Sequence, residues 1–256
     1  MLTFHVAGEF SASQVHCTAV PATRKIVPEV EALIDAAWRD VLARPGVKLF
    51  DGPISRLERF ERAGDRLHLQ LSQTSYRIFV GTNLYHPELA DRFGSEVMAN
   101  PVGVSTVLQT GDGKLLFGVR NAAVAYYPRR THPFAGSLEP RDRCDVFSAA
   151  HRELREELAL ADGDLGALKL LGLVEDRLIR HPELIFTAAT GLTENQLVAQ
   201  MDRAEHHDTI AIGADRDPIE AAVGDKSFTP VGIACLALWG RAHLGVDWYN
   251  RLRDKI

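Results

Sequence analysis

Cysteine is scarce in this chain. Three cysteines occur among its 256 residues, and they have neither the even number of a disulfide framework nor the spacing of metal ligands. We therefore predict that Cys17, Cys144 and Cys235 are free thiols in a reducing compartment. This pattern argues against a small secreted domain that is stabilised by disulfides.

Long apolar runs are also missing. The longest apolar stretch, Val231–Trp239, is shorter than the ~20 residues that a membrane-spanning helix needs. Residues Met1–Phe10 have no basic segment and include Glu9, which does not match a secretory signal. The expected location is therefore the cytoplasm, with no membrane as a partner.

Positive charge is neither abundant nor clustered. The net charge is −5, the isoelectric point is near 6.1, and lysine and arginine are scattered along the chain. Nucleic acids and anionic membranes attract basic patches, so neither is expected as a partner. A small soluble nucleotide remains compatible with this charge, and the sequence leaves the oligomeric state open.

The chain is long enough for a large core with a smaller unit attached to it. Hydrophobic residues make up 46% of the sequence. We predict a smaller α+β subdomain over residues 1–98 and a main domain over residues 99–256. Strands and helices alternate irregularly in the predicted elements, which indicates an α/β fold with a mixed sheet and helices on both faces.

Local patterns predict the individual elements. Helical spacing of apolar residues, with Pro28 in the first turn, predicts a helix over 27–43 that is ended by Arg44-Pro45-Gly46. Further helices are predicted at 87–92, 194–204, 230–242 and 247–253. Further strands are predicted at 102–109, 114–120, 168–178, 183–189 and 209–212.

A hairpin is predicted in the N-terminal part. Polar and apolar residues alternate over 54–60 and 66–71, around a turn at Ala63-Gly64-Asp65. Residues 77–79 are expected to continue in an extended conformation.

The most informative segment that is present is Arg152-Glu153-Leu154-Arg155-Glu156-Glu157, which places three carboxylates on one face of a predicted helix. Like charges at this spacing destabilise an exposed helix by about 0.2–0.5 kcal/mol per pair, and a divalent cation between them removes that cost. Magnesium prefers such oxygen ligands. The alternative interpretation is a solvated helix surface with an Arg152–Glu156 ion pair.

The flanks of this segment favour the metal site. Asp145 is predicted to cap the helix, and a glycine turn at Ala135–Pro140 precedes it and contains Glu139. The helix has one apolar stripe, formed by Val146, Ala150, Leu154 and Leu158. Burial of this stripe would hold the three carboxylates toward the glycine turn.

The segment resembles the Nudix box, which marks hydrolases of nucleoside diphosphates linked to another moiety. The matching positions are Arg152, Glu153, Leu154, Glu156, Glu157 and Leu160. Ala159 stands where the pattern ends in glycine, Cys144 stands where it has an upstream glutamate, and Gly136 lies two residues too far upstream. The loop therefore carries an insertion around residues 141–143. Three carboxylates are alternatives for the upstream one: Glu139, Asp142 and Asp145.

Segments outside the box narrow the resemblance. They are Phe50-Asp51-Gly52-Pro53, Arg56-Leu57, residues 74–83 (TSYRIFVGTN) and residues 100–104 (NPVGV). Together they are similar to the animal Nudix hydrolases that cleave UDP-glucose and UDP-galactose, a subfamily that also has a lengthened box. The resemblance implies a Nudix-type α/β/α sandwich and magnesium-dependent release of UMP and a sugar 1-phosphate, with manganese as a substitute metal.

The resemblance also implies roles for residues of the box. The expected metal ligands are Glu153, Glu156 and Glu157, with Glu139 assisting, and Arg152 is expected to orient a glutamate. The general base is either a box glutamate or a later residue, for which Glu205 is the candidate. His206-His207 has no spaced third ligand and is not a zinc motif.

Substrate-binding candidates come from the same segments. Arginine forks suit diphosphates, which points to Arg77, Arg129 and Arg130, although surface arginine is the alternative for each. Aromatic rings that could stack on uracil are Tyr76, Tyr127 and Phe134, although core packing is the alternative for these rings. Asn83 and Gly136 complete the predicted set.

Three further functions compete with cleavage of a nucleotide sugar. One is hydrolysis of another nucleoside diphosphate derivative, such as ADP-ribose or a dinucleotide. Another is a sensor that binds nucleotide sugars without cleaving them, which the three intact box glutamates disfavour. A purely structural module is the third.

Overall fold

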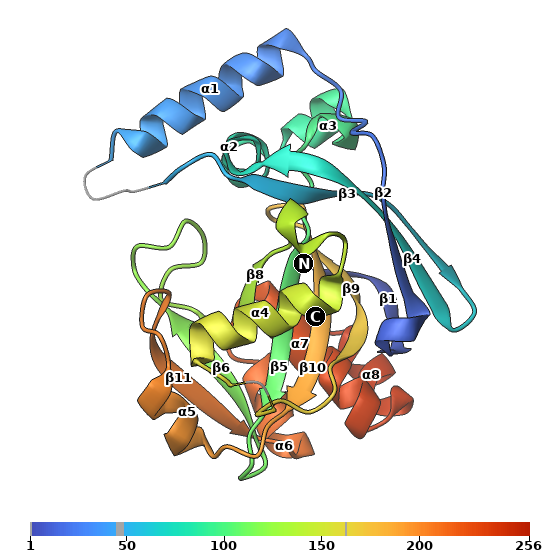
Figure 1. The fold of residues 1–256 in the computed structure, drawn as a ribbon, viewed down its shortest axis with the longest axis vertical. Coiled ribbons are helices and arrows are strands. Elements are labelled where there is room, and N and C mark those ends of the chain that lie inside the picture. Colours follow the sequence, from blue (N-terminus) through green and yellow to red (C-terminus); the bar gives the residue numbers. More distant parts are fainter. Residues whose placement is uncertain (1, 45–48, 162) are drawn as a thin grey trace.

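The protein is described here by a computed structural model, which covers residues 2–44, 49–161 and 163–256. An eight-stranded mixed sheet lies at its centre, with the strand order β1-β9-β10-β5-β6-β11, while β7 pairs with β6 and β8 pairs with β5 (Figure 1). The strands are β1 (Leu2–Phe10), β5 (Gly103–Gln109), β6 (Lys114–Arg120), β7 (Thr131–His132), β8 (Phe134–Ser137), β9 (Lys169–Asp176), β10 (His181–Ala189) and β11 (His206–Gly213).

Helices cover both faces of this sheet, with α4 (Val146–Leu158) in front and α7 (Pro230–His243) behind it in Figure 1. Side chains alternate between the two faces along each strand. Leu116 therefore packs in one core with Leu154 of α4, whereas Leu115 packs in another with Leu236 of α7. The predicted mixed sheet with helices on both faces is confirmed.

A second, three-stranded sheet has the order β2-β4-β3. Its strands are β2 (Val15–Ala19), β3 (Pro53–Ala63) and β4 (Arg66–Ser75). β3 and β4 form the predicted hairpin, and Gly64 in its turn has a φ of +64°, a conformation in which glycine lacks the steric penalty of other residues. Strand β2 was not predicted from the sequence.

Most predicted helices are confirmed with small shifts at their ends. Besides α4 and α7, the structure has α1 (Pro28–Leu42), α3 (Leu89–Phe93), α5 (Glu194–Gln200), α6 (Arg216–Val223) and α8 (Val246–Arg253). Helix α6 was not predicted. Pro45 and Gly46, the predicted end signal of α1, lie outside the described residues. In the part of the chain that the structure describes, every helix is too short or too polar to cross a bilayer.

The extended conformation predicted for residues 77–79 is wrong. Residues Tyr76–Phe79 form the short helix α2, and a π-helical turn follows over Val80–Leu84. Ser75 explains the change, because its hydroxyl accepts a hydrogen bond from the backbone N–H of Ile78 at 3.4 Å and caps the helix. This cap outweighs the strand preference of the aromatic and β-branched residues.

The two sheets share a core. Leu69 of the small sheet belongs to the same hydrophobic cluster as Val146 of α4 and Phe186 of β10. In addition, β1 lies within residues 1–98 but pairs with β9 in the large sheet. The division of the chain at residue 98 stays a prediction, while the packing joins both parts around the N-terminal end of α4.

The prediction of free thiols is confirmed for all three cysteines, and the reducing compartment stays a prediction. Cys17, Cys144 and Cys235 are free thiols, and Cys235 is a buried residue of α7. Burial raises the pKa of Cys17 to about 12, so this thiol stays protonated at neutral pH.

Candidate functional site

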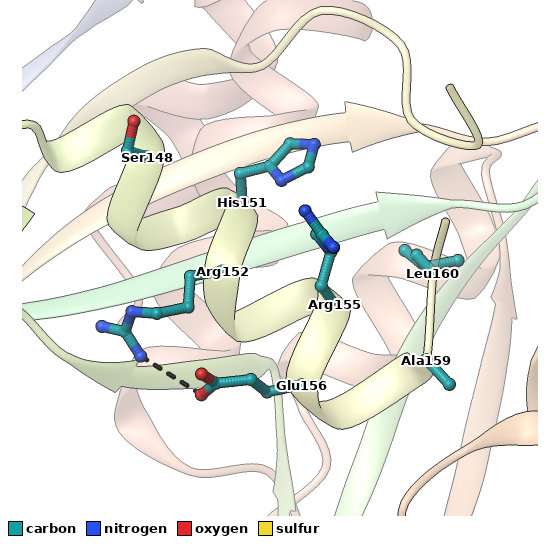
Figure 2. A pocket seen from close by; sticks show the side chains of 7 residues that line it. All are labelled: Ser148, His151, Arg152, Arg155, Glu156, Ala159 and Leu160. Carbon is teal, nitrogen blue, oxygen red and sulfur yellow. Dashed lines mark hydrogen bonds and ion pairs between the residues drawn. The ribbon is translucent and has the colours of Figure 1, made fainter. Parts of the chain in front are cut away.

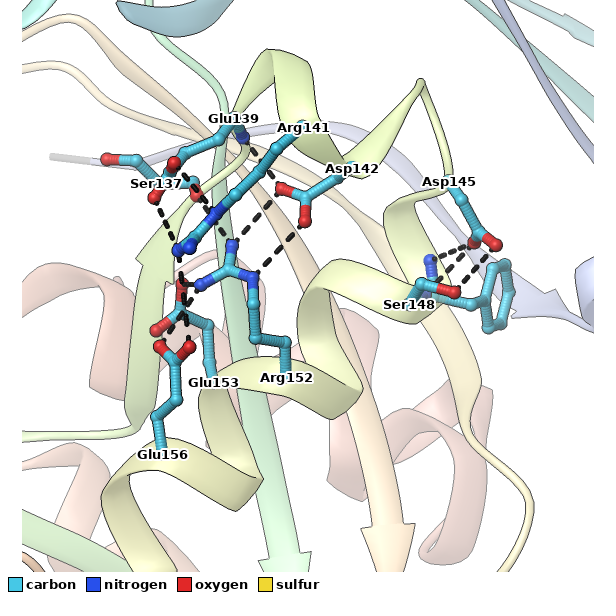
Figure 3. Close-up of polar contacts among 10 residues, drawn as sticks. Ser137, Glu139, Arg141, Asp142, Asp145, Ser148, Arg152, Glu153 and Glu156 are labelled. Atoms are coloured by element: carbon cyan, nitrogen blue, oxygen red, sulfur yellow. Dashed lines mark hydrogen bonds and ion pairs between the residues drawn. The ribbon is translucent and has the colours of Figure 1, made fainter. Parts of the chain in front are cut away.

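Helix α4 begins at the predicted cap. The Asp145 carboxylate accepts hydrogen bonds from the backbone N–H groups of Phe147 at 3.1 Å and Ser148 at 3.0 Å (Figure 3). The predicted apolar stripe is buried along its whole length. Cap and stripe fix how the helix presents its carboxylates.

Arg152 is the centre of an ion-pair network on α4 (Figure 3). Its guanidinium donates to Asp142 at 3.1 and 3.2 Å, to Glu153 at 2.6 Å and to Glu156 at 3.2 Å. Among the three alternatives for the upstream carboxylate, Asp142 is the one that pairs with Arg152. Glu139 pairs instead with Arg141 at 2.9 Å, and Asp145 serves as the helix cap.

Gly136 makes room for Glu153. A Cβ atom at position 136 would lie 2.1 Å from a Glu153 carboxylate oxygen, which is closer than any real side chain approaches. Burial raises the pKa of Glu153 to about 7, although the neighbouring Arg152 lowers it. The glycine of the turn thus meets the box helix at a carboxylate, as the sequence pattern predicted.

Glu157 is the most buried carboxylate of the box, with 8% of its surface exposed. One of its oxygens accepts a hydrogen bond from the backbone N–H of Ala135 at 3.3 Å, and the other oxygen, Oε2, has no hydrogen-bond partner. Burial raises the pKa of Glu157 well above its ordinary value, and the charge of Glu205 adds to this effect. Such an orphaned buried oxygen is typical of a group that awaits a ligand.

The partner groups for Glu157 come from the start of β11. Glu157, Glu205 and His206 each offer a ligand atom within 4.8 Å of the others, and His206 Nε2 lies 3.3 Å from Glu157 Oε2. Two carboxylates and one imidazole fit a divalent cation, and one of these carboxylates, Glu157, has an oxygen without a hydrogen-bond partner. We call these three residues the Glu157 cluster.

The large sheet brings this cluster together. His206 pairs with Arg120 across β11 and β6, and a register shift between His206 and Asp208 re-aims the start of the strand. On the neighbouring strand, a Cβ atom at Gly118 would lie 2.3 Å from the His206 ring, so the ring needs a glycine there. His206 is 1% exposed and fixed in place.

Two of the other predicted metal ligands, Glu156 and Glu139, make ion pairs outside the Glu157 cluster. Glu156 is exposed and pairs with Arg152, and both line a hollow of about 590 Å³ on the outer face of α4 (Figure 2). Glu139 is half-buried and pairs with Arg141. Their assignment as ligands stays a prediction, and the structure adds His206, which sequence reasoning had set aside.

Comparison with known proteins gives relatives of one kind. No protein-family profile matches the chain. It is 32% identical over 168 residues to the human protein named uridine diphosphate glucose pyrophosphatase NUDT22, which covers 60% of this chain and 55% of that protein. The protein of the same name from Bos taurus is also 32% identical over 168 residues, covering 60% and 57%. This chain resembles the Nudix UDP-glucose pyrophosphatases. The predicted resemblance is confirmed, although the chain spans only about half the length of these relatives.

Solved structures show a weaker likeness to the chain. A MutT protein from Methanosarcina mazei Go1 has a TM-score of 0.41 at 14% identity and covers 56% of this chain and 94% of its own. A Nudix hydrolase from Nitrosomonas europaea has a TM-score of 0.40 at 18% identity and covers 56% and 89%.

Two of the three arginines predicted to bind substrate have side-chain contacts outside the Glu157 cluster. Arg77 forms an ion pair with Asp35, and Arg130 donates a hydrogen bond to the backbone carbonyl of Phe228 at 2.8 Å. Arg129 is exposed, with a φ of +62°. Their positions give no support to a shared diphosphate fork, and their role in binding stays a prediction.

Two predicted binding residues are part of the protein's interior. Phe134 is fully buried and meets the His206 ring edge-on, with ring centroids 5.5 Å apart, so it has no free face for a base. The Asn83 amide is also fully buried and donates to the backbone carbonyls of Ile179 at 3.0 Å and Arg180 at 2.8 Å. The core alternative explains Phe134, and structural hydrogen bonds explain Asn83.

The tyrosines are less enclosed. Tyr76 is half-buried and packs edge-on against Phe79 with a centroid distance of 5.9 Å. The Tyr127 hydroxyl donates to Asp176 at 2.5 Å, which holds that ring in the 121–130 loop. Stacking of either ring on a base stays a prediction.

Sequence reasoning also missed Arg120, the last residue of β6. The predicted strand at 114–120 contained a signal for it, because period-two alternation places Arg120 on the same face as Leu116. That face is covered by α4, so an arginine there is buried rather than solvated.

Proposed function

We propose that this protein is a divalent-metal-dependent hydrolase of UDP-sugars. Water would break the P–O–P linkage of UDP-glucose or UDP-galactose, and the products would be UMP and the sugar 1-phosphate. The observation that carries the proposal is the Glu157 cluster, which lies at the Nudix-like helix of a chain similar to UDP-glucose pyrophosphatases. Magnesium is the proposed metal, with manganese as its substitute.

The residues of the cluster supply the ligands that such a reaction needs. A bound divalent cation neutralises the anionic diphosphate oxygens and makes the phosphorus easier to attack. Glu157, Glu205 and His206 would hold it, because their ligand atoms already converge. Glu205 is exposed, so it is also the proposed group to accept a proton from the attacking water.

The rest of the box forms an ion-pair network on the same helix as Glu157. Arg152 holds Glu153 and Glu156 through two ion pairs, and Asp142 holds Arg152 from the other side. Gly136 leaves the space that the Glu153 carboxylate fills. A rigid network of this kind keeps carboxylates in place without the cost of reorganising them during the reaction.

Hydrolysis is tested by incubating the protein with UDP-glucose and magnesium or manganese and measuring UMP by chromatography. Glu157→Gln keeps the size of the side chain but removes its charge, and we expect turnover to fall by about 100-fold or more. The matched control is Glu61→Gln, at an exposed position on β3, which should retain full turnover. A wild-type protein that releases no UMP with either metal would exclude the proposal.

The same assay separates the competing functions. Faster cleavage of ADP-ribose or a dinucleotide than of any UDP-sugar would assign the protein to another nucleotide class. Tight binding of UDP-glucose by calorimetry without product over hours would identify a sensor instead.

Metal binding has a readout that does not require turnover. We expect magnesium or manganese to raise the melting temperature of the wild-type protein, because a ligand that binds only the folded state stabilises it. The rise should be smaller in Glu157→Gln and in His206→Gln, since each loses one ligand. Equal shifts in the wild type and both variants would place the metal away from the Glu157 cluster.

A further inference from the structure

Unpartnered polar atoms gather beside the Glu157 cluster. Six of the eight buried side-chain atoms without a hydrogen-bond partner, counted over the described residues, belong to this region. They are Arg120 Nε, His132 Nε2, Glu157 Oε2, His181 Nδ1, His181 Nε2 and His206 Nδ1. Folded proteins leave few such atoms, and they are seldom grouped, so this region is built for a polar ligand.

Glu157 lies on α4, and the other side chains that carry these atoms come from strands of the large sheet. His206 is opposite Arg120 across β11 and β6, and His132 is opposite Gly118 across β7 and β6. His181 joins them through the ring of Tyr126, whose centroid lies 6.3 Å from the His181 ring and 4.8 Å from Arg120 Cζ.

Arg120 is the unusual member of this group. It is 6% exposed, yet no carboxylate of the described residues lies within 4.0 Å of its guanidinium. Arginine is seldom buried without a partner, because the interior solvates its charge poorly. The nearby histidines offer no counter-charge, because an imidazole is either neutral or positively charged.

The contact with Tyr126 shows which part of the guanidinium is available. Its Cζ atom lies over the Tyr126 ring, so one face of the planar group is covered by the aromatic ring. The N–H groups of a guanidinium lie in its plane and point outward from its edge. A tetrahedral oxyanion can therefore meet this edge while the ring contact is kept.

We propose that Arg120 binds a phosphate group of the ligand next to the Glu157 cluster. This assignment rests on the proposed function, since the phosphate would be one of the two in the nucleotide diphosphate. The guanidinium would supply the counter-charge for the phosphate, and the phosphate would compensate the buried charge of Arg120. Arg77 and Arg130 have other contacts and would not form this part of the site.

Calorimetry without added metal tests the proposal with pyrophosphate and with UDP as probes. Arg120→Gln should weaken the binding of both probes by roughly 10- to 100-fold, because hydrogen bonds to a charged group are lost. The matched control is Arg253→Gln, since Arg253 also lies over a tyrosine ring, with Cζ 5.9 Å from the Tyr249 centroid, but is exposed on α8. Affinity for neutral uridine should be the same in all three proteins.

A second variant covers the case in which Arg120→Gln does not fold. Arg120→Lys keeps the charge but loses the planar fork, so pyrophosphate binding should be intermediate between wild type and Arg120→Gln. The melting temperature without anion gives another readout. It should be no lower in Arg120→Gln than in the wild type, because an uncompensated buried charge has been removed. A clear fall would assign Arg120 a structural role and overturn the proposal.

The outcomes distinguish this proposal from the proposed function. Cleavage of UDP-glucose together with wild-type affinity for pyrophosphate and UDP in Arg120→Lys and Arg120→Gln would overturn the role of Arg120 and leave the hydrolase intact. Pyrophosphate binding that depends on Arg120 in a protein that cleaves no UDP-sugar would retain Arg120 and exclude the function. A wild-type protein that binds neither probe would overturn the assignment.

Discussion

Ala159 ends the box helix in a conformation that suits glycine. Its φ is +50°, in the left-handed region, where a Cβ atom is disfavoured. We expect Ala159→Gly to raise the free energy of unfolding by about 1 kcal/mol, measured by urea denaturation. The control is Ala32→Gly at an exposed position inside α1, where glycine should cost about 1 kcal/mol instead. A loss of stability in Ala159→Gly would contradict the strained cap.

Gly136 gives a second prediction about a single residue. In Gly136→Ala the new methyl group would overlap the Glu153 carboxylate and displace it. Displacement of a positioned group by about 1 Å can cost about 100-fold in rate, so we expect UDP-glucose hydrolysis to fall by that order. Gly191→Ala is the control, because a Cβ atom there meets nothing within 4 Å. Unchanged hydrolysis in Gly136→Ala would show that turnover does not depend on the position of the Glu153 carboxylate.

Two aspartates near the start of helix α4 have different roles, because Asp145 caps the helix and Asp142 pairs with Arg152. Asp145→Ala should lower stability by about 1 kcal/mol, because two backbone N–H groups lose their acceptor, and should leave turnover largely intact. Asp142→Ala should lower turnover instead, because Arg152 loses a partner. Urea denaturation and the UMP assay on both variants test this division. A loss of turnover in Asp145→Ala with none in Asp142→Ala would make Asp145 the substitute for the upstream glutamate.

The helices and strands also show what the sequence could predict. The hairpin at β3 and β4 and the helix α4 followed from local alternation and spacing, which neighbouring residues set by themselves. Strand β1 was missed although Phe4, Val6 and Phe10 alternate with polar residues, and its neighbour β9 lies far away in the sequence. The π-helical turn at Val80–Leu84 was missed because it depends on tertiary packing rather than on propensity.

The candidate site shows the same difference between local patterns and contacts that are distant in the sequence. Gly136 and the box glutamates could be proposed from the sequence because they belong to one short motif along the chain. Arg120 and His206 were not singled out, because they meet only through the register of β6 and β11. Phe134 was chosen for its aromatic ring, but three-dimensional packing places it in the core.

For the whole molecule, the buried Glu183 predicts a pH-dependent stability. Its side chain joins β10 to β5 through a 3.0 Å hydrogen bond from Ser105, and burial raises its pKa to about 8. In the unfolded chain the carboxyl ionises near pH ~4.3, so between there and pH 8 the folded state holds the extra proton. The contribution of Glu183 to the unfolding free energy is therefore fully present below pH ~4.3 and is lost as the pH rises toward about 8.

Glu183→Gln tests this reasoning. We expect the wild type to lose about 1 kcal/mol or more of unfolding free energy between pH 5 and pH 8 through this group, by the linkage relation. The Gln variant should lack this part of the loss, which urea denaturation at both pH values would measure. Parallel pH profiles in the two proteins would show that Glu183 is already ionised in the folded state.

The pairing of β1 with β9 has a consequence for how the protein is made. His5 of β1 and Glu175 of β9 are hydrogen-bonded across 170 positions of sequence. A ribosome that adds roughly 5–20 residues per second needs on the order of 10–30 s to reach β9 after β1 has emerged. During that interval β1 has no partner strand in β9, so we expect its backbone N–H and C=O groups to be open to other chains until β9 is made.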